Sequence, residues 1–208
     1  MKNTKTHGII SGLRDCEENE INSEAQGCIF DVSTLGECAE FPYGYVGNES
    51  ANSFAEPCVF LKFNKIFNWE PTPIDPTTLN DEAYEKMPEV LKKKIALAED
   101  QNMVWIDCFG RYAADKEAFQ FEYYPEHQGI PIKYFPFRGK KYAYQIPLIA
   151  LKIRQEKENW GQLTHIECRA WYDGVYHNTK DKAGLVQFEL QMIPTDSSLA
   201  STMPGYGK

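Results

Sequence analysis

The sequence has no apolar run long enough to cross a bilayer, and residues 1–15 lack the apolar core of a signal peptide. It also has no stripe of basic residues. The net charge is −8, and the short lysine run at positions 92–94 lies among acidic residues. Nucleic acid or an anionic membrane face would require such a stripe as its binding surface. We therefore exclude nucleic acid as a partner and expect contact with a membrane only through an anchor absent from this chain.

Motifs for catalysis and cofactor binding are missing as well. There is no Gly-x-Ser-x-Gly, no phosphate-binding P-loop and no dinucleotide-binding Gly-x-Gly-x-x-Gly. His165-x-Glu167 resembles the H-x-E of zinc deaminases, but no P-C-x-x-C follows it. We expect no catalytic residue, no metal ligand and no cofactor. An enzyme whose site is assembled from distant residues is kept as an alternative hypothesis.

No two cysteines have the C-x-x-C spacing that zinc sites and thioredoxin-like centres use, and only four histidines are present. Six cysteines at wide spacing favour structural disulfides, and hence an oxidising compartment, over free buried thiols. Spacing alone leaves fifteen pairings open. The six are Cys16, Cys28, Cys38, Cys58, Cys108 and Cys168.

A single sequon, Asn48-Glu49-Ser50, lies in a polar stretch that we expect to be a surface loop. It predicts glycosylation at Asn48, which again indicates an extracellular location. Extracellular chemistry without a signal peptide does not describe a complete natural product, so we expect the chain to be a fragment of a longer protein.

Strand signals dominate the rest of the chain. It contains 12 Tyr, 12 Phe and 4 Trp, which favour strands, and turn residues separate six strand-like segments. These segments are residues 58–67, 103–108, 118–124, 144–154, 164–172 and 185–193. In 164–172, apolar residues such as Ile166 alternate with polar ones such as Glu167, as in a strand with one buried face. We predict a mainly β fold, an antiparallel β-sandwich.

One short helix is predicted inside this series, over residues 88–100. Pro88 suits a first helical position, and Leu91, Ile95 and Ala98 share one face. Lysines 92–94 are predicted to form its solvated side. Residues 1–27 are predicted to be a flexible approach segment, 28–193 the β-sandwich, and the small, polar residues 194–208 a disordered tail.

Residues 129–147 form an unusual segment that mixes aromatics, basic residues and three prolines. Pro131 and Pro136 prevent regular strand pairing. Aromatic side chains that a regular sheet cannot bury are favoured at protein interfaces. The other interpretation is that they fill the end of the sandwich, and the residues alone leave both open. The five aromatics are Tyr134, Phe135, Phe137, Tyr142 and Tyr144.

Two motifs in this segment carry a resemblance to a known family. They are Tyr134-Phe135-Pro136-Phe137-Arg138-Gly139-Lys140 and Tyr144-Gln145-Ile146-Pro147-Leu148-Ile149-Ala150. They resemble the aromatic-proline and Q-P-L-x-A signatures of the β-subunits of P-type sodium/potassium-transporting ATPases. The contexts of the six cysteines agree, among them Leu35-Gly36-Glu37-Cys38 and Glu56-Pro57-Cys58. The resemblance covers residues 15–193.

The resemblance implies an immunoglobulin-like β-sandwich stapled by three disulfides. It implies that these disulfides join cysteines that are neighbours in the sequence: Cys16 with Cys28, Cys38 with Cys58, and Cys108 with Cys168. It also implies a contact with the pump α-subunit through the aromatic motif. The implied contact residues are Tyr134, Phe135, Pro136, Phe137 and Gly139.

The resemblance further implies an accessory, non-catalytic role. The chain would lie on the extracellular side of the plasma membrane, as the ectodomain of a single-pass type II protein. It would assist folding, membrane delivery and stability of the α-subunit and modulate potassium affinity. A proton/potassium-pump β-subunit is a close alternative. A cell-adhesion or junction protein of the same fold, acting without a pump, is a second. β-Subunits on neighbouring cells are a further candidate partner.

Overall fold

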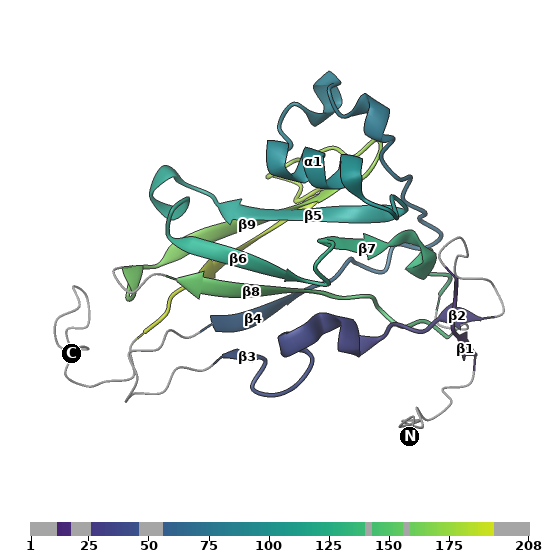
Figure 1. The fold of residues 1–208 in the computed structure, drawn as a ribbon, viewed down its shortest axis with the longest axis horizontal. Helices are drawn as coiled ribbons and strands as arrows, with labels where there is room; N and C mark the ends of the chain where they lie inside the picture. Colours follow the sequence, from purple (N-terminus) through teal and green to yellow (C-terminus); the bar gives the residue numbers. More distant parts are fainter. Residues whose placement is uncertain (1–11, 18–25, 46–55, 140–142, 156–158, 194–208) are drawn as a thin grey trace.

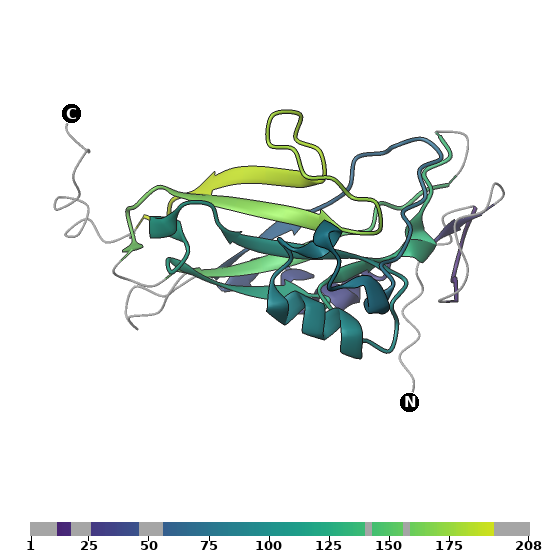
Figure 2. The same cartoon turned by 90° about the horizontal axis from the view of Figure 1, so that it is seen from above.

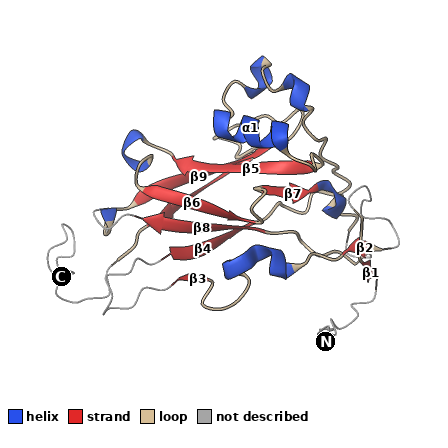
Figure 3. Ribbon diagram, in the orientation of Figure 1, coloured by secondary structure: helices blue, strands red, loops and turns tan. Residues whose placement is uncertain are grey.

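The computed structural model describes residues 12–17, 26–45, 56–139, 143–155 and 159–193. Two four-stranded antiparallel sheets form the body of the molecule (Figure 1), and strands make up most of its regular structure (Figure 3). The predicted mainly β fold, with antiparallel sheets and three disulfides, is confirmed.

The first sheet, here the β5 sheet, has the strand order β10-β9-β5-β7. Its strands are β5 (Met103–Gly110), β7 (Gly129–Pro131), β9 (Thr164–Trp171) and β10 (Leu185–Leu190). β9 is central, since it pairs with β10 through Leu185↔Arg169 and with β5 through Trp105↔Trp171. Three of these strands overlap predicted segments, with β5 running two residues beyond its segment 103–108. β7 was not predicted, because Pro131 at its end argues against a strand.

The second sheet, here the β8 sheet, has the order β3-β4-β8-β6. Its strands are β3 (Gly44–Tyr45), β4 (Glu56–Leu61), β6 (Phe119–Tyr124) and β8 (Ile149–Gln155). Two predicted segments were too long. β4 ends at Leu61 and not at residue 67, and β8 begins at Ile149 and not at residue 144.

The main core lies between the two sheets. Alternate residues of each strand point into it, as the two-residue period of a strand requires. Val104 and Ile106 of β5 meet Leu151 and Ile153 of β8 in one buried cluster, and Ile166 of β9 belongs to it. The predicted inward face of residues 164–172 is therefore correct.

A helical module covers the outer face of the β5 sheet (Figures 1 and 2). It comprises two short 3-10 helices, η2 (Pro76–Thr78) and η3 (Glu82–Tyr84), and the α-helix α1 (Glu89–Leu97). Leu91 and Ile95 of α1 form a second core with Trp105 and Trp171, which are directly opposite each other on β5 and β9. Because both faces of β5 are covered, its residues 103–106 are all buried. None of the helices in the described ranges has the length and apolarity that crossing a bilayer requires.

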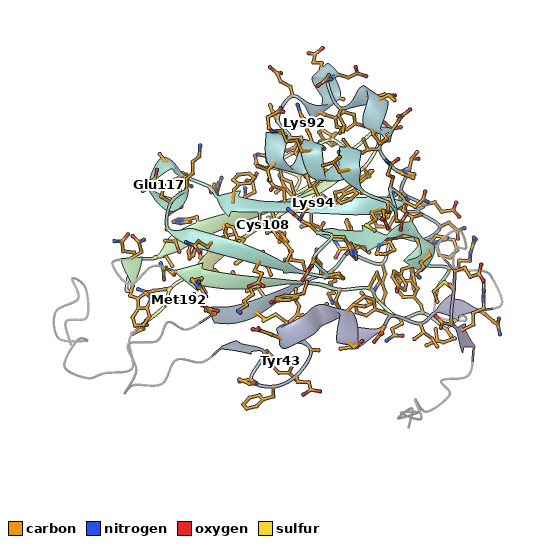
Figure 4. The ribbon with its side chains drawn as sticks, viewed as in Figure 1. Tyr43, Lys92, Lys94, Cys108, Glu117 and Met192 are labelled. Atoms are coloured by element: carbon orange, nitrogen blue, oxygen red, sulfur yellow. A yellow bond between two sulfur atoms is a disulfide. The ribbon has the colours of Figure 1, made fainter. Side chains whose placement is uncertain are left out.

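The prediction that lysines 92–94 form a solvated side of the helix holds for Lys93 alone: the Lys92 side chain is only 14% exposed, and Lys94 is also partly buried. Its ammonium donates to Gln128 Oε1 at 2.9 Å and to the Glu126 carbonyl at 3.1 Å. Figure 4 shows Lys94 between α1 and β5. Partial burial lowers its pKa. The loop after β6 lies against the helix, and no pattern within the helix reveals that neighbour.

Three disulfides stabilise the chain, and they join the pairs that the family resemblance implies. Cys108–Cys168 links β5 to β9, and Cys38–Cys58 links η1 (Val32–Cys38) to β4. Cys16–Cys28 joins the chain just after β1 (Leu13–Arg14) to β2 (Gly27–Cys28), which pairs with β1 in parallel. The division at residues 27/28 stays a prediction, and the predicted tail, 194–208, lies outside the described residues.

Candidate functional site

The segment singled out in the sequence runs along the end of the sandwich and connects the two sheets. It begins with β7, whose Pro131 is opposite Met103 of β5, and continues through η5 (Ile132–Tyr134). The Phe135–Pro136 peptide bond is cis. The description resumes at residue 143, and residues 143–148 lead into β8, so a sheet lies at each end of the segment.

The first half of the aromatic motif points inward. Tyr134 is 7% exposed and Phe135 3%, and Pro136 is buried. Phe135 packs edge-on against Phe63, with ring centroids 5.6 Å apart, and against Trp69 at 5.3 Å. Burial raises the pKa of Tyr134. For these three residues the structure supports the interpretation that they fill the end of the sandwich, and a direct contact with a partner would require them to become exposed.

The second half of the motif is more accessible. Phe137 and Gly139 are partly exposed, and the Phe137 ring lies 5.1 Å from that of Tyr144. Gly139 has a φ of 97°, which favours glycine over residues with a Cβ. Phe137 forms a parallel bridge with Phe67. Of the five residues implied as contacts with the α-subunit, only Phe137 and Gly139 are therefore accessible to a partner. The buried residues Tyr134, Phe135 and Pro136 pack beneath them.

Polar contacts hold this surface in place. Arg138 Nη2 lies 3.4 Å from Glu70 Oε1. Gln145 makes two hydrogen bonds to the backbone of Phe30: its Oε1 accepts from the Phe30 N–H at 2.9 Å, and its Nε2 donates to the Phe30 carbonyl at 3.1 Å. The side chain thus replaces a strand neighbour for Phe30. The sequence offered Gln145 only as part of a motif, without this role.

We expect Gln145→Ala to lower the free energy of unfolding by about 1–3 kcal/mol, because it leaves two partly buried backbone groups without partners. Urea titration of the purified chain measures this. Gln191→Ala is the matched control, since Gln191 makes one exposed hydrogen bond to Gly161 and its loss should cost under about 0.5 kcal/mol. Equal effects of the two substitutions would contradict the assigned role.

A second polar cluster, missed by sequence reasoning, lies on the outer face of the β8 sheet. Lys152 Nζ is 2.7 Å from Glu37, 3.1 Å from Glu56 and 3.7 Å from Glu122, and Arg154 pairs with Glu56. Burial opposes the charge of Glu56, but hydrogen bonds from Arg154 and Lys152 outweigh it and lower the Glu56 pKa. The alternation of β8 places Lys152 and Arg154 on one face, but only the fold brings the glutamates to them.

Two hollows in the described surface test the enzyme hypothesis, which predicted a pocket of histidines or carboxylates with shifted pKa values. The hollow of about 140 Å³ is lined by the Lys152 cluster. In the other, of about 330 Å³, His165 lies 3.6 Å from Asp115 and 3.5 Å from Glu189. Asp107, whose carboxyl pKa burial raises to about 6, lines neither. The carboxyl with a shifted pKa that does line a hollow, Glu56, has its pKa lowered by its ion pairs with Lys152 and Arg154, and such a shift is also typical of a structural ion-pair network.

Asn48, the predicted glycosylation site, lies outside the described residues. Within the described ranges, no three His, Cys, Asp or Glu side chains form a group that could hold a metal ion.

Comparison with known proteins identifies the family to which the chain is similar. A family model described as "Sodium / potassium ATPase beta chain" matches residues 4–188. The chain is 32% identical over 184 residues to sodium/potassium-transporting ATPase subunit beta-1 of Drosophila melanogaster, covering 86% of this chain and 54% of the relative. It is 31% identical over 191 residues to the Drosophila subunit beta-2, covering 89% and 55%. Identity to the Homo sapiens subunit beta-2 is 26% over 184 residues, covering 84% and 51%. The chain thus spans about half the length of these relatives.

Proposed function

Because the chain belongs to the sodium/potassium ATPase beta-chain family, we propose that it is the extracellular part of a non-catalytic accessory subunit of a P-type sodium/potassium pump. The observation that supports this most strongly is the family match over residues 4–188. The disulfides and the aromatic surface agree with it, since both lie within the matched range.

The proposed partner is the pump's α-subunit, and the proposed contact is the accessible half of the aromatic motif. Phe137 offers a partly exposed ring on a surface fixed by hydrogen bonds and packing. Such rigid aromatic surface binds at a low cost in conformational entropy. The buried Tyr134, Phe135 and Pro136 contribute by supporting Phe137.

The proposed work of the subunit is to assist folding and membrane delivery of the α-subunit, to stabilise it, and to modulate its potassium affinity at the extracellular side of the plasma membrane. A stable contact would accomplish the first three, because a partner that binds only the folded α-subunit stabilises it by mass action. An effect on potassium affinity would require that the contact favours one conformation of the α-subunit.

The protein, expressed with its native termini and purified from detergent-solubilised membranes, is expected to bring a pump α-subunit with it. Phe137→Ala should reduce the recovered α-subunit several-fold, while Val90→Ala, a change at an exposed apolar residue of α1 far along the chain, should not. Potassium activation of the recovered pump, measured in the same preparations, tests the modulating role. Purification without any α-subunit would reject the proposal and favour the adhesion hypothesis.

A further inference from the structure

A turn that follows β4, in a stretch predicted as part of the strand 58–67, presents an exposed apolar pair beside the accessible aromatics. Ile66 is 51% exposed and Phe67 65%, in a run, residues 64–68, whose members are all exposed. We call this run the 64–68 turn. Single exposed apolar residues are common on protein surfaces, but an adjacent aliphatic and aromatic pair next to other rings is typical of an interface.

The 64–68 turn is held firmly despite its exposure. The Ile66 N–H donates to the Asn64 carbonyl at 2.9 Å, and the Asn68 N–H donates to the Phe137 carbonyl at 2.9 Å. Phe67 is bridged to Phe137, and Trp69, directly after the turn, packs against the buried Phe135 ring at 5.3 Å. The turn and the aromatic motif therefore form one surface whose conformation is already set before any partner binds, which lowers the entropic cost of binding.

A positive charge lies on the same surface. Lys65 Nζ is 5.4 Å from the centroid of the Phe137 ring and 6.0 Å from that of Tyr144, within cation–π range of both. Within the described part of the chain, no carboxylate forms an ion pair with Lys65. The surface thus combines two exposed apolar side chains, two partly exposed rings and one ammonium group.

We propose that the 64–68 turn, together with Phe137 and Tyr144, is the docking surface for an extracellular loop of the α-subunit that carries an apolar or aromatic side chain next to an aspartate or glutamate. This rests on the proposed function and deepens it. The apolar pair and rings would bury the partner's apolar side chain, and Lys65 would pair with the acidic one. A second copy of this chain fits less well, because a two-fold contact through so small a patch would bring two Lys65 ammonium groups together.

The test compares two sets of variants in the native-length protein purified with the α-subunit. Ile66→Ser with Phe67→Ser, and separately Lys65→Glu, should each reduce α-subunit recovery by about tenfold, which corresponds to about 1.4 kcal/mol. The matched controls lie on α1: Val90→Ser with Leu97→Ser, at exposures of 77% and 84%, and Lys93→Glu. These controls should leave recovery unchanged. Lys65→Arg keeps the charge and should restore it.

The outcomes separate the two claims. If the parent protein recovers α-subunit and both turn variants recover as much as their controls, the docking surface is rejected while the proposed function stands. If the parent recovers none, the proposed function fails and this inference fails with it. Lys65→Glu alters only an exposed ammonium group, so its loss of binding, with an unchanged urea midpoint, would support docking over misfolding. A defect of Lys65→Glu that shrinks in high salt would support an acidic partner residue.

Discussion

Replacing both Cys108 and Cys168 with serine is expected to lower the free energy of unfolding by about 4 kcal/mol, from the entropy of the unfolded chain. The disulfide closes a loop with a sequence separation of 60, against 20 for Cys38–Cys58 and 12 for Cys16–Cys28. A longer closed loop removes more conformational freedom from the unfolded state, and the shorter loops correspond to about 3 kcal/mol each. Both cysteines are buried where β5 and β9 already pair, so the native strands remain in register without the bond.

Urea titration of the purified chain measures this effect, and Cys16→Ser with Cys28→Ser is the matched control. The sharper test is which variant loses more stability. This order depends on the lengths of the closed loops and less on the absolute free energy assigned to each loop. A Cys108/Cys168 variant that unfolds at the same urea concentration as the parent would contradict the prediction. A Cys16/Cys28 control variant that loses more stability than the Cys108/Cys168 variant would also contradict it.

Lys152→Met is expected to lower the free energy of unfolding by about 3 kcal/mol. The side chains of Lys152 and Glu56 are 10% and 9% exposed, while the other two glutamates of the cluster are more than half exposed. Removing the lysine leaves the Glu56 carboxylate buried with Arg154 as its remaining partner, and an undercompensated buried charge is costly. Lys93→Met is the control, since Lys93 is an exposed lysine of α1 and its substitution should cost under about 0.5 kcal/mol.

A double variant separates the charge from the packing. Lys152→Met with Glu56→Gln should recover much of the lost stability, because the buried carboxylate is then gone. If the double variant is as unstable as the sum of its single changes, the interaction between the two residues is not what stabilises this face of the β8 sheet.

The same cluster sets an expected pH dependence. The pKa of Glu56 is lowered in the folded state, so the folded state binds its proton less tightly than the unfolded state does. The stabilisation from Glu56 is therefore present above its ordinary pKa of about 4.3 and is lost as the pH falls through the lowered folded value. The stability difference between the parent and Lys152→Met should be largest near neutral pH and shrink in acid.

The strands and the helix were largely readable from the sequence. Segment 164–172 and the helix near Leu91 and Ile95 carry local periods that predict which residues are buried, whereas 103–106 is a continuous apolar run buried on both faces. The ends of the strands were harder to predict from the sequence. Residues 144–148 were predicted as the start of a strand but do not form one: the segment contains Pro147, and Gln145 bonds through its side chain to Phe30, 115 positions away.

The candidate site could be predicted only in part, because contacts with distant segments also decide its exposure. Five aromatics in one short segment indicated an unusual surface, but not which of them face outward. Phe135 is buried because Phe63 and Trp69 pack against it, and Phe137 is accessible beside a turn at Phe67. Those neighbours lie about 70 positions earlier in the chain.

By itself, the sequence determined the mainly β class, the strand-forming segments, the supply of cysteines and, by resemblance, the family. Local sequence patterns are enough to predict these features, because each pattern involves residues only a few positions apart. Only the tertiary structure decided that Tyr134 and Phe135 are buried, that Lys152 joins three glutamates, and that Ile66 and Phe67 complete an exposed surface. Exposure and ion pairing depend on which distant segments come together, and no local period in the chain encodes that.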